Sequence, residues 1–324
     1  MKNRGAYAGA LIGLLAAVGC TGPPPPSERS VVLVTLDTTR ADRLGAYGGS
    51  AVPTPRFDRV AADGVTFDLA LSQVPLTLPA HSSILTGRYP ATHGVRHNGI
   101  FQLPDAEITL TERLAAEGFE TAAFVAAYVL NRGYGTEQGF ATYDDVPADR
   151  FEGGRDQLFE AERTADEVNQ RVFDWLDRRE RPEDRFFLWV HYYDPHDPYD
   201  PPEREGRTLH GDGYDREISY LDHAFGDLLD RLRDDGLLER TILVVVGDHG
   251  ESLGEHDERT HGIFLYESAL RVPFFLRAPG LVPEGGRVGG PVELVDVGPT
   301  ILDLLELEPF ANAEGRSLLP RIRG

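Results

Sequence analysis

The sequence has one cysteine, Cys20, and one lysine, Lys2, among its 324 residues. A single cysteine excludes a disulfide bond within one chain. Because Lys2 is the only lysine, every other fixed cation is an arginine. Once the first residues are removed, any mechanism that needs a lysine beside the substrate is therefore excluded.

Positive charge is scarce as well, since 53 acidic residues outnumber 32 lysine and arginine residues and the formal net charge is -21. This balance argues against nucleic acid or an anionic membrane surface as the main partner. The apolar content of 41% is enough for one large core, in one or two domains. No internal repeat is visible in the sequence.

The start of the chain has the pattern of a secretion signal. Lys2 and Arg4 make a basic start, and residues 6–18 form an apolar run that is short for a membrane span. The run ends at residues 17–20, Ala-Val-Gly-Cys, which resemble the lipobox of bacterial lipoproteins. An ordinary secretory signal with an incidental cysteine is the alternative.

A lipobox predicts removal of residues 1–19, lipidation of Cys20 and a stiff, proline-rich spacer over residues 20–29. We therefore expect a lipid-anchored protein of the bacterial cell envelope, which faces the periplasm or is exposed on the surface. The membrane is expected as a partner only through this anchor, because no other transmembrane segment is visible in the sequence.

Apolar, β-branched runs alternate with helical patterns along the rest of the chain. Strands are expected over residues 31–36, 65–71, 121–127, 186–190, 242–246 and 272–276. Helices are expected over residues 55–64, 80–85, 111–117, 158–179, 218–232 and 294–305. Runs such as Val-Val-Leu-Val-Thr-Leu are apolar on both faces, as in buried parallel strands. The pattern predicts an α/β fold with a mostly parallel central sheet and helices on both faces.

Residues 74–88 contain the candidate nucleophile. Pro79 lies where a first helical turn is expected, and residues 80–85 can continue the helix. Thr77 therefore lies at a loop-to-helix junction, where unpaired N–H groups and the helix dipole favour an anion. Its hydroxyl can cap the helix, or it can attack a bound oxyanion ester.

Polar side chains follow the ends of the predicted elements. They are Asp37, Thr77, those of residues 191–196, and the pair Asp248 and His249. The carboxyl ends of strands form the ligand site of open α/β sheets, so we expect these side chains to converge. Three oxygen ligands and one imidazole nitrogen suit zinc or manganese better than calcium. The sequence predicts one divalent metal held by Asp37, Thr77, Asp248 and His249, which acidifies the Thr77 hydroxyl.

Five segments, in this order, resemble the sulfatase family within the alkaline-phosphatase superfamily. They are VVLVTLDTTRADRLGAYG (31–48), TLPAHSSILTGRYPATHGV (77–95), HYYDPHDPY (191–199), GDHGESLGEH (247–256) and HGIFLYESALRVPFFLRAPG (261–280). The resemblance implies an alkaline-phosphatase-like sheet flanked by helices, with a metal at the strand ends. It also implies hydrolysis or transfer of a sulfuryl or phosphoryl group through a covalent intermediate.

The nucleophile segment departs from the family pattern. Sulfatases make formylglycine from Cys or Ser in a Cys/Ser-x-Pro-x-Arg pattern, whereas residues 77–81 read Thr-Leu-Pro-Ala-His. Nothing here can be converted to formylglycine, and His81 stands where the family has arginine. A plain threonine resembles the phosphoryl-handling relatives, because water can hydrolyse a phosphoryl-threonine with help from a metal.

The metal-binding segments depart in the same direction. The tandem acidic pair of the family is Asp37-Thr38, its Asp-Asn is Asp248-His249, and its lysine is His261. These changes lead away from the calcium and formylglycine machinery and resemble relatives that bind a transition metal through Asp, Thr, Asp and His. Zinc or manganese is therefore expected, with calcium as the alternative.

The resemblance gives roles to five further residues. His196 is expected to contact the transferred group or the leaving oxygen, and His261 to act as a general acid or a phosphate contact. His81 is expected to replace the missing arginine beside Thr77. Arg40 and His93 are candidate substrate contacts. A structural role is the alternative for each of these residues.

A second metal site is a further alternative, made by Asp194, His196 and His261. The spacing does not reproduce the Asp-x-x-x-His pattern of two-metal relatives. We therefore favour a single metal.

Residues 30–324 are expected to form a sulfatase-like catalytic domain without the smaller C-terminal subdomain usual in the family. The favoured function is metal-dependent hydrolysis of phosphate or phosphonate esters, of a small molecule or a glycan, through a covalent Thr77 intermediate. The alternatives are a sulfatase proper, a phosphoryl or phosphoethanolamine transferase of the envelope, and a binding lipoprotein without catalytic activity.

Overall fold

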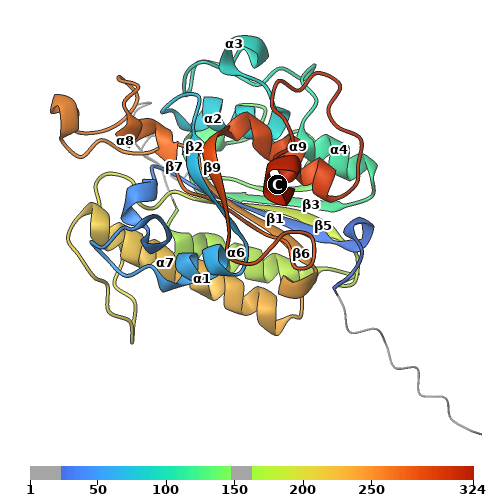
Figure 1. Ribbon diagram of the computed structural model, residues 1–324, viewed down its shortest axis with the longest axis horizontal. Helices are drawn as coiled ribbons and strands as arrows, with labels where there is room; N and C mark the ends of the chain where they lie inside the picture. The colour runs from blue at the N-terminus through green and yellow to red at the C-terminus, as the bar shows by residue number, and fades with distance from the viewer. Residues whose placement is uncertain (1–22, 147–162) are drawn as a thin grey trace, which may run out of the picture.

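Nine strands form one sheet at the centre of the molecule, in the order β4-β3-β5-β1-β6-β8-β2-β7, with β9 beside β2 (Figure 1). The computed structural model describes residues 23–146 and 163–324. The predicted signal with Cys20, and the first part of the helix predicted over 158–179, lie outside these residues. Within the described part, no helix is both long enough and apolar enough to cross a membrane.

One half of the sheet is parallel. It consists of β4 (Thr142–Asp144), β3 (Glu120–Val125), β5 (Phe186–Tyr192), β1 (Ser30–Leu36) and β6 (Thr241–Gly247). Every residue of β1, β5 and β6 is buried, as expected for strands covered on both faces. The register pairs Leu36 with Tyr192 and Gly247, so these strands end together at one edge of the sheet.

The other half of the sheet has mixed directions. Strand β8 (Phe274–Arg277) runs antiparallel to β6 and to β2 (Val65–Leu71), β7 (Arg271–Val272) runs antiparallel to β2, and β9 (Gly286–Glu293) runs parallel to β2. The single strand predicted over 272–276 is divided at Pro273, because proline has no N–H for the ladder. The mostly parallel sheet itself is confirmed.

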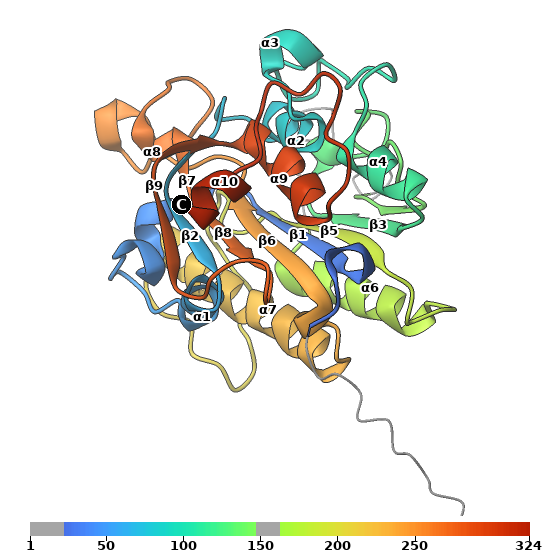
Figure 2. The same cartoon turned by 45° about the vertical axis from the view of Figure 1, so that its right-hand side comes forward.

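Helices cover both faces of the sheet, as predicted (Figures 1 and 2). On one face lie α1 (Pro55–Ala62), α6 (Ala165–Arg178) and α7 (Tyr214–Asp234). On the other lie α2 (Thr77–Thr86), α4 (Leu110–Ala116) and α9 (Val297–Leu304). The shorter helices are α3 (Pro90–His93), α8 (Glu267–Leu270) and α10 (Leu319–Arg323). Single 3-10 turns occupy Pro26–Glu28, Ala41–Arg43, Gly45–Tyr47, Tyr128–Leu130, Leu238–Arg240, Glu255–Asp257 and Leu294–Asp296.

Helix α2 is buried along its whole length, and it carries Thr77 as its first residue. Its polar side chains are satisfied locally, because the hydroxyls of Ser82 and Thr86 donate to carbonyls one turn earlier. The helix ends at Gly87, whose φ of 67° is left-handed and therefore suits glycine. The buried helix fixes Thr77 at the edge of the sheet where β1, β5 and β6 end.

Candidate metal and active site

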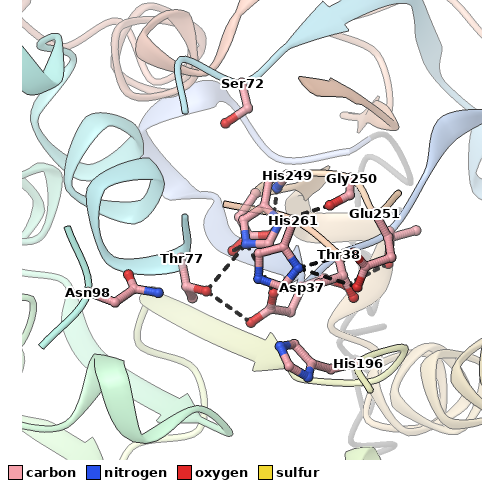
Figure 3. Close-up of polar contacts among 12 residues, drawn as sticks. Asp37, Thr38, Ser72, Thr77, Asn98, His196, His249, Gly250, Glu251 and His261 are labelled. Atoms are coloured by element: carbon pink, nitrogen blue, oxygen red, sulfur yellow. Dashed lines mark hydrogen bonds and ion pairs between the residues drawn. The ribbon is translucent and has the colours of Figure 1, made fainter. Parts of the chain in front are cut away.

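The residues predicted as metal ligands lie together at this edge (Figure 3). Asp37 follows β1, Asp248 and His249 follow β6, and Thr77 begins α2. Oγ1 of Thr77 is 3.4 Å from Oδ2 of Asp37 and 3.4 Å from Nε2 of His249. The same His249 nitrogen is 3.4 Å from Oδ1 of Asp37 and 3.6 Å from Oδ2 of Asp248. All these side chains are buried.

The atoms at the centre of this group fit a cation. Oδ1 of Asp37 and Oδ2 of Asp248 are buried and have no hydrogen-bond donor among the described residues, which is costly for a carboxylate. Nδ1 of His249 lies 3.0 Å from the carbonyl oxygen of Gly250 and donates to it, which leaves the Nε2 lone pair facing the carboxylates. Burial lowers the pKa of His249 to about 3, so the ring is neutral and able to bind a metal.

The electrostatics of the two aspartates differ. Burial alone would raise the pKa of Asp37, but the hydrogen bond from His191 and the nearby imidazoles hold it below its usual range. Burial and then the charge of Asp37 raise the pKa of Asp248 well above its usual value. Two carboxylates in one buried site oppose each other, and a divalent cation between them removes that cost.

A second group, made by His81, His191 and Asp248, is also close enough to hold a metal. The hydrogen bonds argue against this use. Nδ1 of His191 accepts from the N–H of Ala126 at 3.3 Å, so the ring carries its proton on Nε2, 3.5 Å from Oδ2 of Asp37. His191 therefore turns its N–H toward Asp37 and offers no lone pair to a metal, so the first group is the better candidate for a cation.

His81 contacts the backbone carbonyl of Thr77 and not its hydroxyl. Nδ1 of His81 is 2.8 Å from the carbonyl oxygen of Thr77, and Nε2 is 2.9 Å from Oγ1 of Thr35. The side chain is 0% exposed, and burial lowers its pKa well below the ordinary value. The predicted role of His81 as a cationic substitute for arginine does not match this placement, because the ring is neutral and both nitrogens are occupied.

A cavity of about 970 Å³ opens beside Thr77. His196 and His261 both line it, as do Asn98, Tyr193 and Arg259. The ring of His196 stacks on Tyr193, with centroids 4.2 Å apart, and contacts the ring of His261 edge-on at 5.3 Å. The two histidines predicted to act on the transferred group thus lie together in the cavity that contains the candidate nucleophile.

A buried carboxylate supports His261. Nδ1 of His261 is 3.2 Å from Oε1 of Glu251, which is 0% exposed, and the hydroxyl of Tyr199 donates to Oε2 of Glu251 at 3.1 Å. Burial alone would lower the pKa of His261, but the hydrogen bond and charge of Glu251 raise it above the ordinary value. The ring therefore holds a proton more readily, and its Nε2 is left for a substrate.

Arg40 and His93 do not line this cavity in the described structure. The guanidinium of Arg40 is bound by Asp42 and Glu255 and by the carbonyl oxygen of Glu251. His93 is buried, and it contacts Oγ of Ser83 and the N–H of Val95. The prediction that they bind substrate does not match this placement, because their polar atoms are used to order loops.

The sequence analysis gave no role to Asn98, Glu251 or the ring of His191. Oδ1 of Asn98 accepts from the N–H of Leu78 at 2.9 Å, so the amide caps the start of α2 beside Thr77 and lines the cavity. Its position in a loop gave no signal. Glu251 lies within the segment GDHGESLGEH, where its closeness to the ligands Asp248 and His249 was the one available signal.

Comparison with known proteins places the site in a family. The profile described as Sulfatase matches residues 29–307. The ulvan-active sulfatase of Formosa agariphila is 26% identical over 339 residues, covering 92% of this chain and 66% of that protein. The arylsulfatase of Clostridium perfringens is 27% identical over 374 residues, covering 89% of this chain and 77% of that protein. The chain thus spans about two thirds to three quarters of the length of these relatives.

Solved structures have the same fold. A protein solved in complex with its substrate D-glucosamine-2-N,6-O-disulfate superposes with a TM-score of 0.76 at 20% identity, covering 91% of this chain and 80% of that chain. The phosphonate monoester hydrolase of Agrobacterium radiobacter superposes with a TM-score of 0.73 at 21% identity, covering 91% of this chain and 77% of that chain. At these identities the likeness concerns the fold, which is the one expected from the sequence.

Proposed function

The chain belongs to the sulfatase family, and from this premise we propose that it is a metal-dependent ester hydrolase with Thr77 as its nucleophile. We propose phosphate or phosphonate esters as the favoured substrates, of a small molecule or a glycan. The observation that carries the proposal is the position of the Thr77 hydroxyl, 3.4 Å from both Asp37 and His249 and beside a cavity of about 970 Å³.

We propose one divalent cation bound by Asp37, Thr77, Asp248 and His249. Ligand atoms that share one cation must lie close to one another. The separations of 3.4 to 3.6 Å around Nε2 of His249 agree with this. A larger ion with more ligands gives a similar spacing, so the nitrogen ligand is the reason to favour zinc or manganese over calcium. When bound, the cation acidifies the Thr77 hydroxyl and neutralises charge on the substrate oxygens.

The residues of the chain then have the following roles. Oγ1 of Thr77 releases its proton to water in the cavity and forms a bond to phosphorus, while the bond from phosphorus to the alcohol oxygen breaks. That oxygen takes a proton from His261, which Glu251 holds in the cavity. Water next attacks the phosphoryl-threonine, releasing phosphate and restoring the hydroxyl. The amide of Asn98, beside Thr77, donates to a substrate oxygen in both steps.

The preference for phosphoryl substrates follows from the nucleophile. A sulfatase releases sulfate from a formylglycine hydrate, and a threonine cannot form one. A threonine ester of phosphate can instead be cleaved by water at phosphorus. The family contains relatives of both kinds of specificity, and the sulfate-cleaving alternative is kept for the test.

The test uses the whole protein with zinc or manganese and four aryl substrates of equal leaving group: a phosphate monoester, a phosphodiester, a phosphonate monoester and a sulfate ester. Thr77→Ala is expected to lower kcat at least about 1000-fold, and Thr77→Ser to retain part of the activity because it keeps the hydroxyl. Mass spectrometry of acid-quenched reactions should find a phosphoryl group on Thr77. Turnover of the sulfate ester alone would overturn the phosphoryl preference and favour the sulfatase.

Two other functions predict different results. A phosphoryl or phosphoethanolamine transferase would modify an envelope glycan faster than it hydrolyses the ester, as product analysis with a glycan acceptor would reveal. A non-catalytic binding lipoprotein would turn over none of the esters, and Thr77→Ala would leave its affinity for phosphate unchanged.

We also propose the cell-envelope location that the lipobox pattern predicts, with Cys20 as the lipidated residue. Expression in a Gram-negative host with radiolabelled palmitate should label the protein. Cys20→Ser should abolish the label and release the protein from the membrane fraction. Labelling that persists in Cys20→Ser would contradict the proposal.

A further inference from the structure

A chain of hydrogen bonds reaches the backbone of Thr77 from two strands of the sheet. Nε1 of Trp189, on β5, is 2.9 Å from Oγ1 of Thr35, on β1. Oγ1 of Thr35 is 2.9 Å from Nε2 of His81, and Nδ1 of His81 is 2.8 Å from the carbonyl oxygen of Thr77. The three linking side chains are 0% exposed, so water does not compete for these bonds.

The donor and the acceptor of each hydrogen bond in this series follow from the atoms that form it. The indole N–H of Trp189 can only donate, so Oγ1 of Thr35 accepts from it and gives its own proton to Nε2 of His81. A carbonyl can only accept, so His81 carries its proton on Nδ1 and donates to Thr77. Every donor has an acceptor when His81 is neutral, and this state agrees with its complete burial.

These hydrogen bonds connect β1, β5 and α2, the elements that carry or precede the residues of the site. Side chains two residues apart in a strand point to the same face, so Thr35 lies on the face of β1 that leads to Asp37. In the same way Trp189 and His191 share a face of β5, and His191 approaches Asp37 at 3.5 Å. The ring of His81 contacts the rings of both Trp189 and His191.

Thr77 needs such support because the start of α2 is weakly capped. The residue before the helix, Leu76, has no side-chain cap, and Asn98 accepts from one first-turn N–H. The Thr77 hydroxyl must stay within about 0.5 Å of its position to attack a substrate and bind a metal. The side chain of His81 fixes the Thr77 backbone from inside the helix, one turn further along.

We propose that Thr35, Trp189 and His81 are positioning residues, which hold Thr77 against Asp37 and His249 through an uncharged hydrogen-bond chain. This inference rests on the proposed function, because it gives these hydrogen bonds a role in the reaction of Thr77. It also gives His81 a role different from that of the family arginine, since the ring orients the nucleophile and adds no positive charge.

The test removes the hydroxyl in the middle of the chain. Thr35→Val has nearly the same shape and leaves His81 without its donor, whereas Thr35→Ser keeps the hydroxyl. The matched control is Thr121→Val, since Thr121 is also buried in the sheet and its hydroxyl also makes two hydrogen bonds, with Gly139 and Ala141.

We expect Thr35→Val to lower kcat about 10- to 100-fold with KM changed less than about twofold, because small misplacement of a reacting group costs up to about 100-fold. Thr35→Ser should stay within about threefold of the wild type, and Thr121→Val should leave kcat unchanged. Zinc affinity, measured by calorimetry, should fall about 10-fold in Thr35→Val and not in Thr121→Val, because Thr77 is a ligand. Equal effects of the two valine substitutions on both readouts would overturn the inference.

A spectroscopic measurement tests the chain without any turnover. Among the ¹⁵N signals of neutral histidine rings with the proton on Nδ1, one should be lost in His81→Gln and altered in Thr35→Val. A proton on Nε2 of His81 would overturn the inference. If the wild type hydrolyses no ester, the proposed function fails, and the zinc affinity and the ¹⁵N signal still decide whether this chain positions Thr77.

Discussion

Nδ1 of His261 lies 3.2 Å from Oε1 of Glu251, a carboxylate with 0% exposure. The pair has the arrangement that orients imidazoles in many hydrolases, with one ring nitrogen held by an acid and the other facing the reacting group. The hydroxyl of Tyr199 binds the second carboxylate oxygen of Glu251, so the acid itself is fixed. Glu251 therefore belongs to the candidate site through its contact with His261.

Replacing Glu251 by glutamine should lower kcat about 10- to 100-fold, which is the usual effect of losing an outer partner. The measurement is kcat and KM with the preferred aryl ester at saturating metal. Glu258→Gln is the matched control, because Glu258 is a buried acid of the same loop that binds Ser252 and the N–H of Phe264 instead. Similar losses in the two variants would mean that the effect comes from the loop and not from His261.

Asp248→Asn should stabilise the metal-free protein while it weakens metal binding. The charge of Asp37 and burial both disfavour the ionised Asp248, and asparagine keeps an oxygen for the N–H of His249. The free energy of unfolding, measured in urea at pH 8 with a chelator, should rise by about 1–2 kcal/mol. Zinc affinity should fall at least about 100-fold, since even outer partners cost 10- to 100-fold. A less stable metal-free variant would contradict this account of the site.

Metal binding should be visible as thermal stability. Because the cation relieves the opposition of Asp37 and Asp248, a concentration of 100 times Kd should stabilise the fold by about 2.7 kcal/mol. For a domain of this size, Tm should rise by about 5 °C or more when zinc or manganese is added to chelator-treated protein. The same rise in His249→Ala would place the metal elsewhere.

The stability should fall in mild acid because of His93. Burial is the main reason that the pKa of His93 is lowered to about 4 in the folded protein, whereas an unfolded histidine has a pKa of about 6.5. The neutral His93 ring therefore makes its full contribution to the stability of the fold above about pH 6.5. This contribution is lost as the pH falls from about 6.5 to about 4. A difference of about 2.5 between the two pKa values corresponds to at most about 3 kcal/mol.

This contribution can be isolated with His93→Gln, which can still donate to Ser83 and does not titrate. Urea unfolding of both proteins at pH 7.5, 5.5 and 4.5 measures the difference in unfolding free energy between them. The advantage of the wild type should shrink as the pH falls. A constant advantage at all three values would mean that folding does not shift the pKa of His93.

Much of the fold could be predicted because local signals agree with the global arrangement. Uninterrupted β-branched runs marked the buried strands, and polar residues directly after them marked the edge where ligands bind. The closeness of Asp37 and Asp248 was predictable from this rule, since each follows a buried strand. The division of one strand at Pro273 could also have been expected, because the missing N–H is a local property.

The supporting residues were not predictable in the same way. Thr35 lies inside an apolar run, where a threonine has the same β-branched shape as its valine neighbours. The role of its hydroxyl is visible only from its hydrogen-bond partners on β5 and α2. Arg40 looked like an anion contact, but the acids that bind it come from a neighbouring turn and a distant loop. Such partners depend on tertiary packing, which spacing along the chain does not record.

Thr35 and Trp189, which support His81, also limit which side chain can replace this histidine. An arginine at position 81 would bring only donors to Oγ1 of Thr35, which already accepts from the indole of Trp189. A single His81→Arg substitution should therefore leave the Thr35 hydroxyl proton without its acceptor and disturb the start of α2. Placing an arginine at position 81 should therefore require accompanying changes at positions 35 and 189.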